Sequence, residues 1–136
     1  MPDTDLCVVV VNYCTPALVI DCLETLLPQV REMGARVSLV DNASPDDSVS
    51  RLQTWIRDNG ADDRVQLIES PDNGGFAAGN NVGIRSCDAK LYLLLNSDTL
   101  VREGALACLM QAMSSEPTVG LLSPRLEWPD GAPQES

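Results

Sequence analysis

Polar residues that could bind a ligand are concentrated in four short segments of the sequence. They are residues 12–13, 41–44, 73–81 and 96–98. Each segment either follows an apolar run typical of a buried strand or precedes a helical pattern. Because ligands of parallel α/β proteins bind at the carboxyl ends of the strands, the sequence predicts one site built from these segments.

Asp98 is the candidate metal ligand. It follows the uncharged run at residues 91–95, and a buried strand there would fix the backbone leading to the carboxylate. Magnesium takes one or two protein carboxylates and completes its shell with water and phosphate oxygens, which suits a single Asp. The alternative is a cap on the helix expected near Glu103. We expect Asp98 to hold Mg²⁺ or Mn²⁺.

Asp41 follows a second apolar run, at residues 37–40, and its carboxylate could accept a hydrogen bond from a base or a ribose. The alternative is that Asp41 or Ser44 only caps the next helix. Ser44-Pro45-Asp46-Asp47 resembles a capping box with proline at the first helical position. We therefore predict that Ser44 is the cap and that Asp41 is free to bind a ligand.

The glycine-rich segment begins with Asn73, Gly74 and Gly75. Glycines let the backbone turn tightly and bring N–H groups near a ligand, and the helix N-terminus behind them favours anions. The segment is not a P-loop, because Asn80 and Asn81 stand where Lys and Ser/Thr are required. Two asparagines near a helix start indicate fixed polar contacts, either with a ligand or, especially for Asn81, within the loop.

Asn12 and Tyr13 follow the first apolar run of the chain. They could offer a ligand an amide group and an aromatic face. Bracing of the loop at the strand end is an equal alternative for both residues.

Short apolar runs alternate with helical patterns throughout the chain. This alternation predicts an α/β fold with a mostly parallel sheet and helices on both faces. The first run is apolar on both sides, which is typical of a central strand and favours the strand order 3-2-1-4. The strands are expected at residues 6–11, 37–40, 65–68, 91–95 and 119–123, and Asp130-Gly131 is expected to form a hairpin-type turn.

Composition excludes several classes of protein. The chain has 136 residues and a formal net charge of −11, which favours a single soluble domain over residues 1–136 and no nucleic-acid partner. No apolar run approaches the roughly 20 residues of a transmembrane segment. The acidic N-terminus lacks the basic start of a secretion signal, so we expect a cytoplasmic protein.

Cysteine and histidine usage narrows the chemistry further. The five cysteines include no C-x-x-C pair, so neither a disulfide framework nor a zinc site is expected. Cys7 and Cys108 lie among apolar residues and are predicted to be buried. Because histidine is absent, catalysis that uses His as a base is excluded.

Together the four segments resemble the N-terminal part of the inverting family-2 glycosyltransferases, which have the GT-A fold, a Rossmann-like nucleotide-diphospho-sugar transferase fold. Within that family they are most similar to the rhamnosyltransferase-like bacterial branch. The resemblance extends over nearly the whole chain, and the ordered set of motifs is more specific than any one of them. The motifs are VVVVNY at residues 8–13, VDNAS at 40–44, NGGFAAGNNVG at 73–83 and LLLNSDT at 93–99.

The resemblance implies a role for each matching position. The residues implied to bind the nucleotide-sugar are Asn12, Tyr13, Asp41, Asn73, Gly74, Asn80 and Asn96. Asp98 matches the metal-binding carboxylate of the family's D-x-D motif. Asn96 replaces the first acidic residue of that motif, and because an amide brings no second negative charge, it is expected to touch the sugar nucleotide instead.

The implied reaction is inverting transfer of a sugar from a UDP- or dTDP-linked donor to a hydroxyl of a glycan or lipid-linked acceptor. The metal would offset charge on the leaving diphosphate. The resemblance places the base and the acceptor site beyond residue 136, so we expect a donor-binding part truncated before them. The expected location is cytoplasmic, with the inner face of the membrane as an alternative.

Two other functions fit the pattern less well. A sugar nucleotidyltransferase usually has a glycine-rich, basic loop after the first strand, and Asn12-Tyr13-Cys14-Thr15-Pro16 is neither. A receiver-type signalling domain needs an acidic pair after the first strand and a lysine after a later strand, and both are missing. A module that binds a nucleotide-sugar without catalysis stays open as an alternative.

Overall fold

The computed structural model describes residues 2–134. The chain forms two compact units, Met1–Glu103 and Gly104–Ser136. The first unit contains the sheet, three helices and all the predicted site residues. The second contains one helix and a segment with little regular structure.

The sheet of the first unit has four parallel strands in the order β3-β2-β1-β4. This is the order predicted from the apolar character of the first run. The strands are β1 (Thr4–Asn12), β2 (Arg36–Asp41), β3 (Val65–Glu69) and β4 (Ala89–Leu95).

β1 lies at the centre of the core. Residues 6–12 are all buried, because helices cover both faces of the sheet and a strand pairs with β1 on each side. Its β-branched residues suit a strand that is enclosed on both faces. The register pairs Asn12 with Asp41 and Val10 with Leu95, so the carboxyl ends of β1, β2 and β4 meet at one edge.

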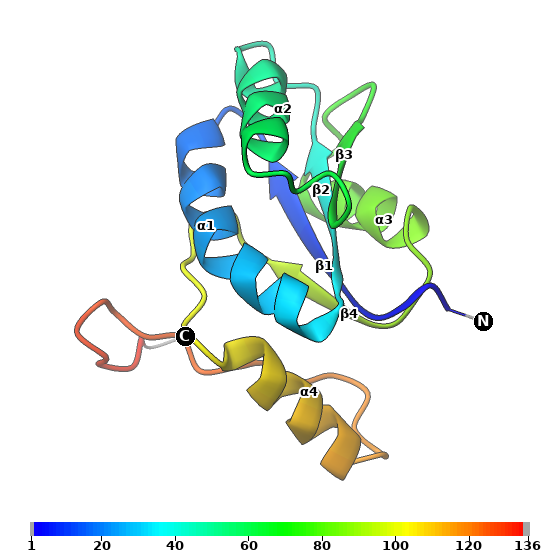
Figure 1. The fold of residues 1–136 in the computed structure, drawn as a ribbon, viewed down its shortest axis with the longest axis vertical. Helices are drawn as coiled ribbons and strands as arrows, with labels where there is room; N and C mark the ends of the chain where they lie inside the picture. Colours follow the sequence, from blue (N-terminus) through cyan, green and yellow to red (C-terminus); the bar gives the residue numbers. More distant parts are fainter. Residues whose placement is uncertain (1, 135–136) are drawn as a thin grey trace. The chain divides into compact units, whose positions relative to one another are not determined.

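Three helices cover the two faces of this sheet, as expected. α1 (Pro16–Met33) and α2 (Ser48–Asp58) lie on one face, and α3 (Phe76–Arg85) lies on the other (Figure 1). α1 begins with Pro16 at its first turn and ends at Gly34, whose φ of 68° is the left-handed conformation that favours glycine. Within residues 2–134, none of the helices has the length and apolar character needed to cross a bilayer.

α3 packs unusually close to the sheet because two of its glycines face the strands. A Cβ added at Gly83 would lie 2.4 Å from Val9 Cγ1, and one added at Gly79 would lie 2.9 Å from Val11 Cγ1 and from Asn42 Nδ2. The face of the sheet under α3 therefore carries Val9, Val11 and Asn42. Because side chains alternate along a strand, Asn12 and Asp41 belong to the opposite face.

Three sequence-based expectations are wrong. β4 is only partly buried, and Leu94 is 49% exposed, because the described residues place no strand beyond this edge of the sheet. Residues 119–123 form no strand, since an apolar run becomes a strand only where a neighbour pairs with it. Cys108 is exposed on α4 (Ala105–Ser115), whereas Cys7 is buried as predicted.

The turn predicted at Asp130-Gly131 is confirmed. Gly131 has a φ of 90°, and its amide donates to the carbonyl oxygen of Trp128 over 2.8 Å. An isolated antiparallel bridge joins Glu127 to Pro133 around it.

Candidate functional site

The carboxylate of Asp41 is held by a network of hydrogen bonds at the carboxyl edge of the sheet. Oδ1 accepts from Asn12 Nδ2 at 2.8 Å and from Ser44 Oγ at 2.7 Å. Oδ2 accepts from the backbone N–H of Ser44 at 3.0 Å. Asp41 is buried, so these donors offset the desolvation of its charge and fix the orientation of the carboxylate.

Asn12 is fully buried and uses both ends of its amide inside the protein. While Nδ2 donates to Asp41, Oδ1 accepts from the backbone N–H of Thr15 at 3.2 Å and from Thr15 Oγ1 at 3.3 Å. These bonds connect the end of β1 to the end of β2 and to the start of α1. Tyr13, which follows, is exposed at the same edge.

The predicted helix cap at Ser44 is wrong. α2 begins at Ser48 and its N-cap residue is Asp47, which makes no side-chain cap bond. The hydroxyl of Ser44 instead donates to Asp41 and accepts from the backbone N–H of Cys14 at 3.0 Å. The expectation that Asp41 is free of protein contacts is therefore wrong. Asp41 and Ser44 are three residues apart, and this spacing allows a bond between their side chains as readily as it allows Ser44 to cap a helix.

The loops that follow β1 and β2 both contain a left-handed residue other than glycine. Cys14 has a φ of 56° and Ala43 has a φ of 59°. This conformation is unfavourable for residues with a Cβ and persists where surrounding contacts enforce it. Here the contacts are those of Ser44, which lies next to Ala43 and bonds to the amide of Cys14.

The glycine-rich segment is tied to the end of β2 by Asn42. Asn42 Nδ2 donates to the carbonyl oxygen of Gly75 at 3.0 Å. Asn73 Oδ1 accepts from the backbone N–H of Gly75 at 2.9 Å, and Gly75 has a φ of 95°. The segment thus leads into α3, whose first turn carries neither a side-chain cap nor an acidic residue. Its backbone N–H groups are suited to an anion.

Asn80, in the second turn of α3, differs from its neighbour Asn81. The side chain of Asn80 is buried and its Oδ1 has no hydrogen-bond partner among the described residues. Asn81 is exposed. A buried acceptor without a partner is unfavourable, so Asn80 is the better candidate for a ligand contact.

Asn96 and Asp98 lie in a turn immediately after β4, and both side chains are exposed. The turn is closed by Thr99, whose Oγ1 donates to the carbonyl oxygen of Asn96 at 2.7 Å. Just beyond it, the backbone N–H of Val101 donates to Thr25 Oγ1 on α1 at 2.9 Å. The turn follows the Val10–Leu95 pair, so it lies at the same edge as Asn12 and Asp41.

The charge of Asp98 affects α1 as well. Burial raises the pKa of the Cys22 thiol to about 11, a hydrogen bond from Thr99 opposes the shift, and the Asp98 carboxylate adds to it. α4 begins at Ala105 without a side-chain cap, so the alternative role of Asp98 as a helix cap is not supported.

A metal ion fits Asp98 only as a single protein ligand. Its carboxylate has no ion pair or hydrogen bond among residues 2–134 that would occupy it. No group of three or more Cys, Asp or Glu able to hold a metal occurs in the described part of the chain. A cation bound here would need oxygens from a phosphate ligand and from water, which is the coordination typical of Mg²⁺.

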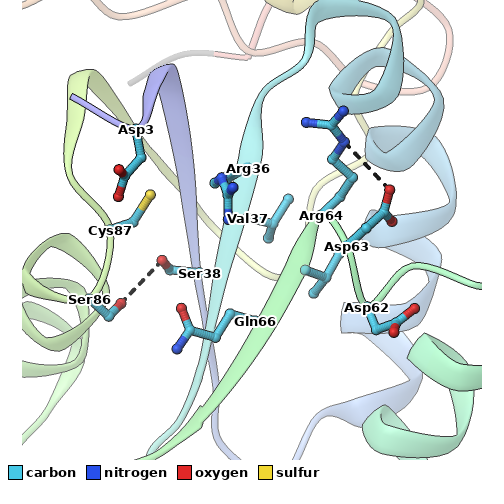
Figure 2. A pocket seen from close by; sticks show the side chains of 11 residues that line it. Asp3, Arg36, Val37, Ser38, Asp62, Asp63, Arg64, Gln66, Ser86 and Cys87 are labelled. Carbon is cyan, nitrogen blue, oxygen red and sulfur yellow. Dashed lines mark hydrogen bonds and ion pairs between the residues drawn. The ribbon is translucent and has the colours of Figure 1, made fainter. Parts of the chain in front are cut away.

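A cavity at the opposite edge of the sheet contains none of the predicted site residues (Figure 2). It lies at the amino ends of β2 and β3 and has a volume of about 70 Å³. That is small against the roughly 300–1,000 Å³ of ligand pockets in proteins. Figure 2 shows Ser38 and Ser86 joined by a hydrogen bond on one wall and Arg64 paired with Asp63 on another.

Two proteins similar to this chain are a glycosyltransferase and a mannosyltransferase. Glycosyltransferase GlyG of Streptococcus pneumoniae is 28% identical over 109 residues, covering 80% of this chain and 35% of GlyG. The mannosyltransferase PcManGT from Pyrobaculum calidifontis, solved in complex with GDP-Man and Mn²⁺, superposes with a TM-score of 0.80 at 25% identity. That match covers 92% of this chain and 36% of the mannosyltransferase.

A third relative supports the fold. S. aureus TarS 1–349 in complex with UDP superposes with a TM-score of 0.70 at 16% identity, covering 89% of this chain and 38% of TarS 1–349. The chain thus spans between a third and two fifths of the length of these relatives. The α/β fold with helices on both faces, predicted to be of the GT-A type, is confirmed. Residues 7–133 match the sequence model of the family described as "Glycosyl transferase family 2", and the chain belongs to that family.

Proposed function

We propose that this chain is the donor-binding part of an inverting, metal-dependent glycosyltransferase. It binds a nucleoside-diphosphate sugar and presents the anomeric carbon to a hydroxyl of a glycan or lipid-linked acceptor. One observation carries the proposal: a buried, oriented Asp41 lies at the same sheet edge as the exposed, unpaired Asp98. Family membership supports it.

In this proposal Asp41 and Tyr13 bind the nucleoside. An ionised carboxylate offers only acceptors, so Asp41 binds a hydrogen-bond donor of the base or the ribose. Tyr13 is 41% exposed and offers a ring face for stacking. Asn12 contributes through Asp41, because its own amide is buried and already bonded.

The N-terminus of α3 binds the diphosphate. Gly74 and Gly75 allow the backbone to approach closely, and the uncapped N-terminus of α3 favours negative charge. Asn73 shapes this segment through its bond to Gly75. The unpartnered Oδ1 of Asn80 accepts a hydrogen bond from a donor on the ligand.

Asp98 holds the Mg²⁺ or Mn²⁺ ion, and Asn96 contacts the sugar nucleotide. When bound, the metal supplies a Lewis acid that offsets the negative charge on the departing diphosphate. The net charge of −11 makes such a cation useful, because the protein surface otherwise repels a diphosphate. The Mn²⁺ and GDP-Man bound by PcManGT support both the metal and the class of donor.

In the proposed reaction the acceptor oxygen attacks the anomeric carbon as the bond to the diphosphate oxygen breaks. The hydroxyl proton passes to a carboxylate base that we place outside residues 1–136. The chain by itself therefore binds the donor and transfers little or no sugar. The relatives named above do not support the rhamnosyltransferase-like branch, so UDP, dTDP and GDP are all candidate nucleotides.

Isothermal titration calorimetry tests this function directly. The 136-residue chain is titrated with UDP, dTDP and GDP, each with and without Mn²⁺. We expect binding of at least one nucleotide that strengthens when Mn²⁺ is present. An affinity that is the same with and without Mn²⁺ would indicate a nucleotide-binding module without metal chemistry. The absence of binding to all three nucleotides would refute the proposal.

A further inference from the structure

Ser44 has a role in the site that neither its predicted place as a helix cap nor the four motifs assign to it. We infer that Ser44 is a positioning residue that presets Asp41, so that one acceptor on Asp41 Oδ2 is presented to a nucleoside. The inference rests on the proposed function of Asp41. It is drawn from the direction of the hydrogen bonds around the Ser44 hydroxyl.

Asp41 is the acceptor to which the Ser44 hydroxyl donates its proton. Oγ accepts from the backbone N–H of Cys14 at 3.0 Å and lies 3.4 Å from Asn12 Nδ2, which is also a donor. Because both neighbours donate, the hydroxyl proton points to Asp41 Oδ1, 2.7 Å away. Ser44 thus links the loop after β1 to the carboxylate at the end of β2.

The same bonds decide which oxygen of Asp41 is left for a ligand. A carboxylate has about four lone-pair sites, two on each oxygen. Among residues 2–134, Oδ1 accepts from Ser44 Oγ and Asn12 Nδ2, whereas Oδ2 accepts only from the Ser44 amide. Ser44 therefore contacts both oxygens, and together with Asn12 it holds the carboxylate in a rotation that leaves a lone-pair site on Oδ2.

The backbone around Ser44 is consistent with this role. Cys14 and Ala43 are both in the left-handed conformation, at φ of 56° and 59°. The bond from the Cys14 amide to Ser44 Oγ stabilises the first, and the bond from the Ser44 amide to Asp41 Oδ2 stabilises the chain just after the second. Without the hydroxyl, Oδ1 would keep only Asn12 Nδ2 and Oδ2 only the Ser44 amide, so the carboxylate would be oriented by one donor fewer.

On UDP the hydrogen-bond donor for Oδ2 has two possible sources, the ring N–H of uracil or a ribose hydroxyl. CDP separates them, because its corresponding ring nitrogen is an acceptor while its ribose is that of UDP. A ring contact predicts that UDP binds more tightly than CDP. A ribose contact predicts equal binding of the two.

The test compares Ser44→Ala, Ser44→Thr and wild type by calorimetry with UDP, dTDP, GDP and CDP in Mn²⁺. We expect Ser44→Ala to lower the affinity for the preferred nucleotide by about tenfold, as for loss of a hydrogen bond that orients a charged group. Ser44→Thr keeps a hydroxyl and should restore most of the affinity. With a ring contact, Ser44→Ala also reduces the preference for UDP over CDP.

The matched control is Ser50→Ala, since Ser50 is an exposed serine on α2 whose hydroxyl bonds only locally, to the carbonyl oxygen of Asp47. Its nucleotide affinities should equal those of the wild type. Circular dichroism and amide NMR spectra check that each variant is folded.

Two results would overturn the positioning role while leaving the proposed function intact. One is wild-type affinity and selectivity in a folded Ser44→Ala variant. The other is a Ser44→Thr variant as weak as Ser44→Ala, which would indicate a packing effect. If the wild type itself binds none of the nucleotides, the proposed function fails and the positioning role fails with it.

Discussion

Asn42 joins the end of β2 to the start of α3, because its Nδ2 donates to the carbonyl oxygen of Gly75 across 3.0 Å. The two residues are 33 positions apart in the chain and belong to different motifs. The bond makes the glycine-rich segment part of the sheet edge rather than an independent loop. Asn42 is buried and Gly75 is exposed, so the bond is partly shielded from competing water.

Removal of this bond should affect both stability and binding. Asn42→Ala leaves the Gly75 carbonyl without its side-chain partner, and we expect a loss of about 1–3 kcal/mol in the free energy of unfolding. Urea denaturation measures that loss, and calorimetry should show weaker nucleotide binding. Gln53→Ala, at an exposed position on α2, is the control and should change stability by less than about 0.5 kcal/mol.

The close approach of α3 to β1 depends on Gly83. A Cβ there would lie 2.4 Å from Val9 Cγ1, so Gly83→Ala forces α3 away from the sheet. We expect destabilisation of about 1–3 kcal/mol, which is typical of an overpacked core. Thermal unfolding with Gly120→Ala as control checks it, since a Cβ at Gly120 meets nothing within 4 Å.

A double-mutant cycle adds a second check on that packing. Val9→Ala removes the methyl group that a new Cβ at Gly83 would meet. The pair Val9→Ala and Gly83→Ala should therefore be less destabilised than the sum of the single variants. Additive losses would show that the contact with Val9 does not determine the spacing of α3.

Asp98 should matter for metal-dependent binding and not for folding. Because its side chain is exposed and unpaired in the described structure, Asp98→Asn should change the free energy of unfolding by less than about 0.5 kcal/mol. The increase in nucleotide affinity caused by Mn²⁺ should fall by about tenfold or more. Asp88→Asn, at the amino end of β4, makes the same chemical change at an exposed site and should leave that increase intact. An undiminished effect of Mn²⁺ in Asp98→Asn would remove the metal assignment.

Stability should fall at alkaline pH because two of the buried thiols have a raised pKa. Burial raises the pKa of Cys22 from 9.0 to about 11 and is also the main cause of a rise in the pKa of Cys87 to about 11. Between pH 9 and 11 the unfolded chain loses these protons while the folded chain keeps them, so the folded state is progressively disfavoured. The slope should approach about 1.4 kcal/mol per pH unit for each thiol.

Urea denaturation at pH 8, 9 and 10 under reducing conditions measures this slope. Cys22→Ala should reduce it, whereas Cys14→Ala, at an exposed cysteine, should not. A stability that is independent of pH over this range would contradict the prediction.

Much of this architecture follows from the sequence alone. The run at residues 6–11 is apolar on both sides, and only a central strand can bury both, which leads to the order β3-β2-β1-β4. Polar residues directly after apolar runs must lie at the carboxyl edge, since all the strands are parallel. Asp41, Asn12 and the turn containing Asp98 could therefore be assigned to one edge without coordinates.

Tertiary structure decided which of those residues touch one another. The local sequence indicates a helix cap at Ser44, and only the position of the Cys14 amide and the Asp41 carboxylate turns the Ser44 hydroxyl towards β2. The burial of Asn12 likewise depends on its partners at Asp41 and Thr15. A pattern of residues predicts which elements form, but hydrogen bonds between elements depend on register and loop conformation, which are properties of the assembled sheet.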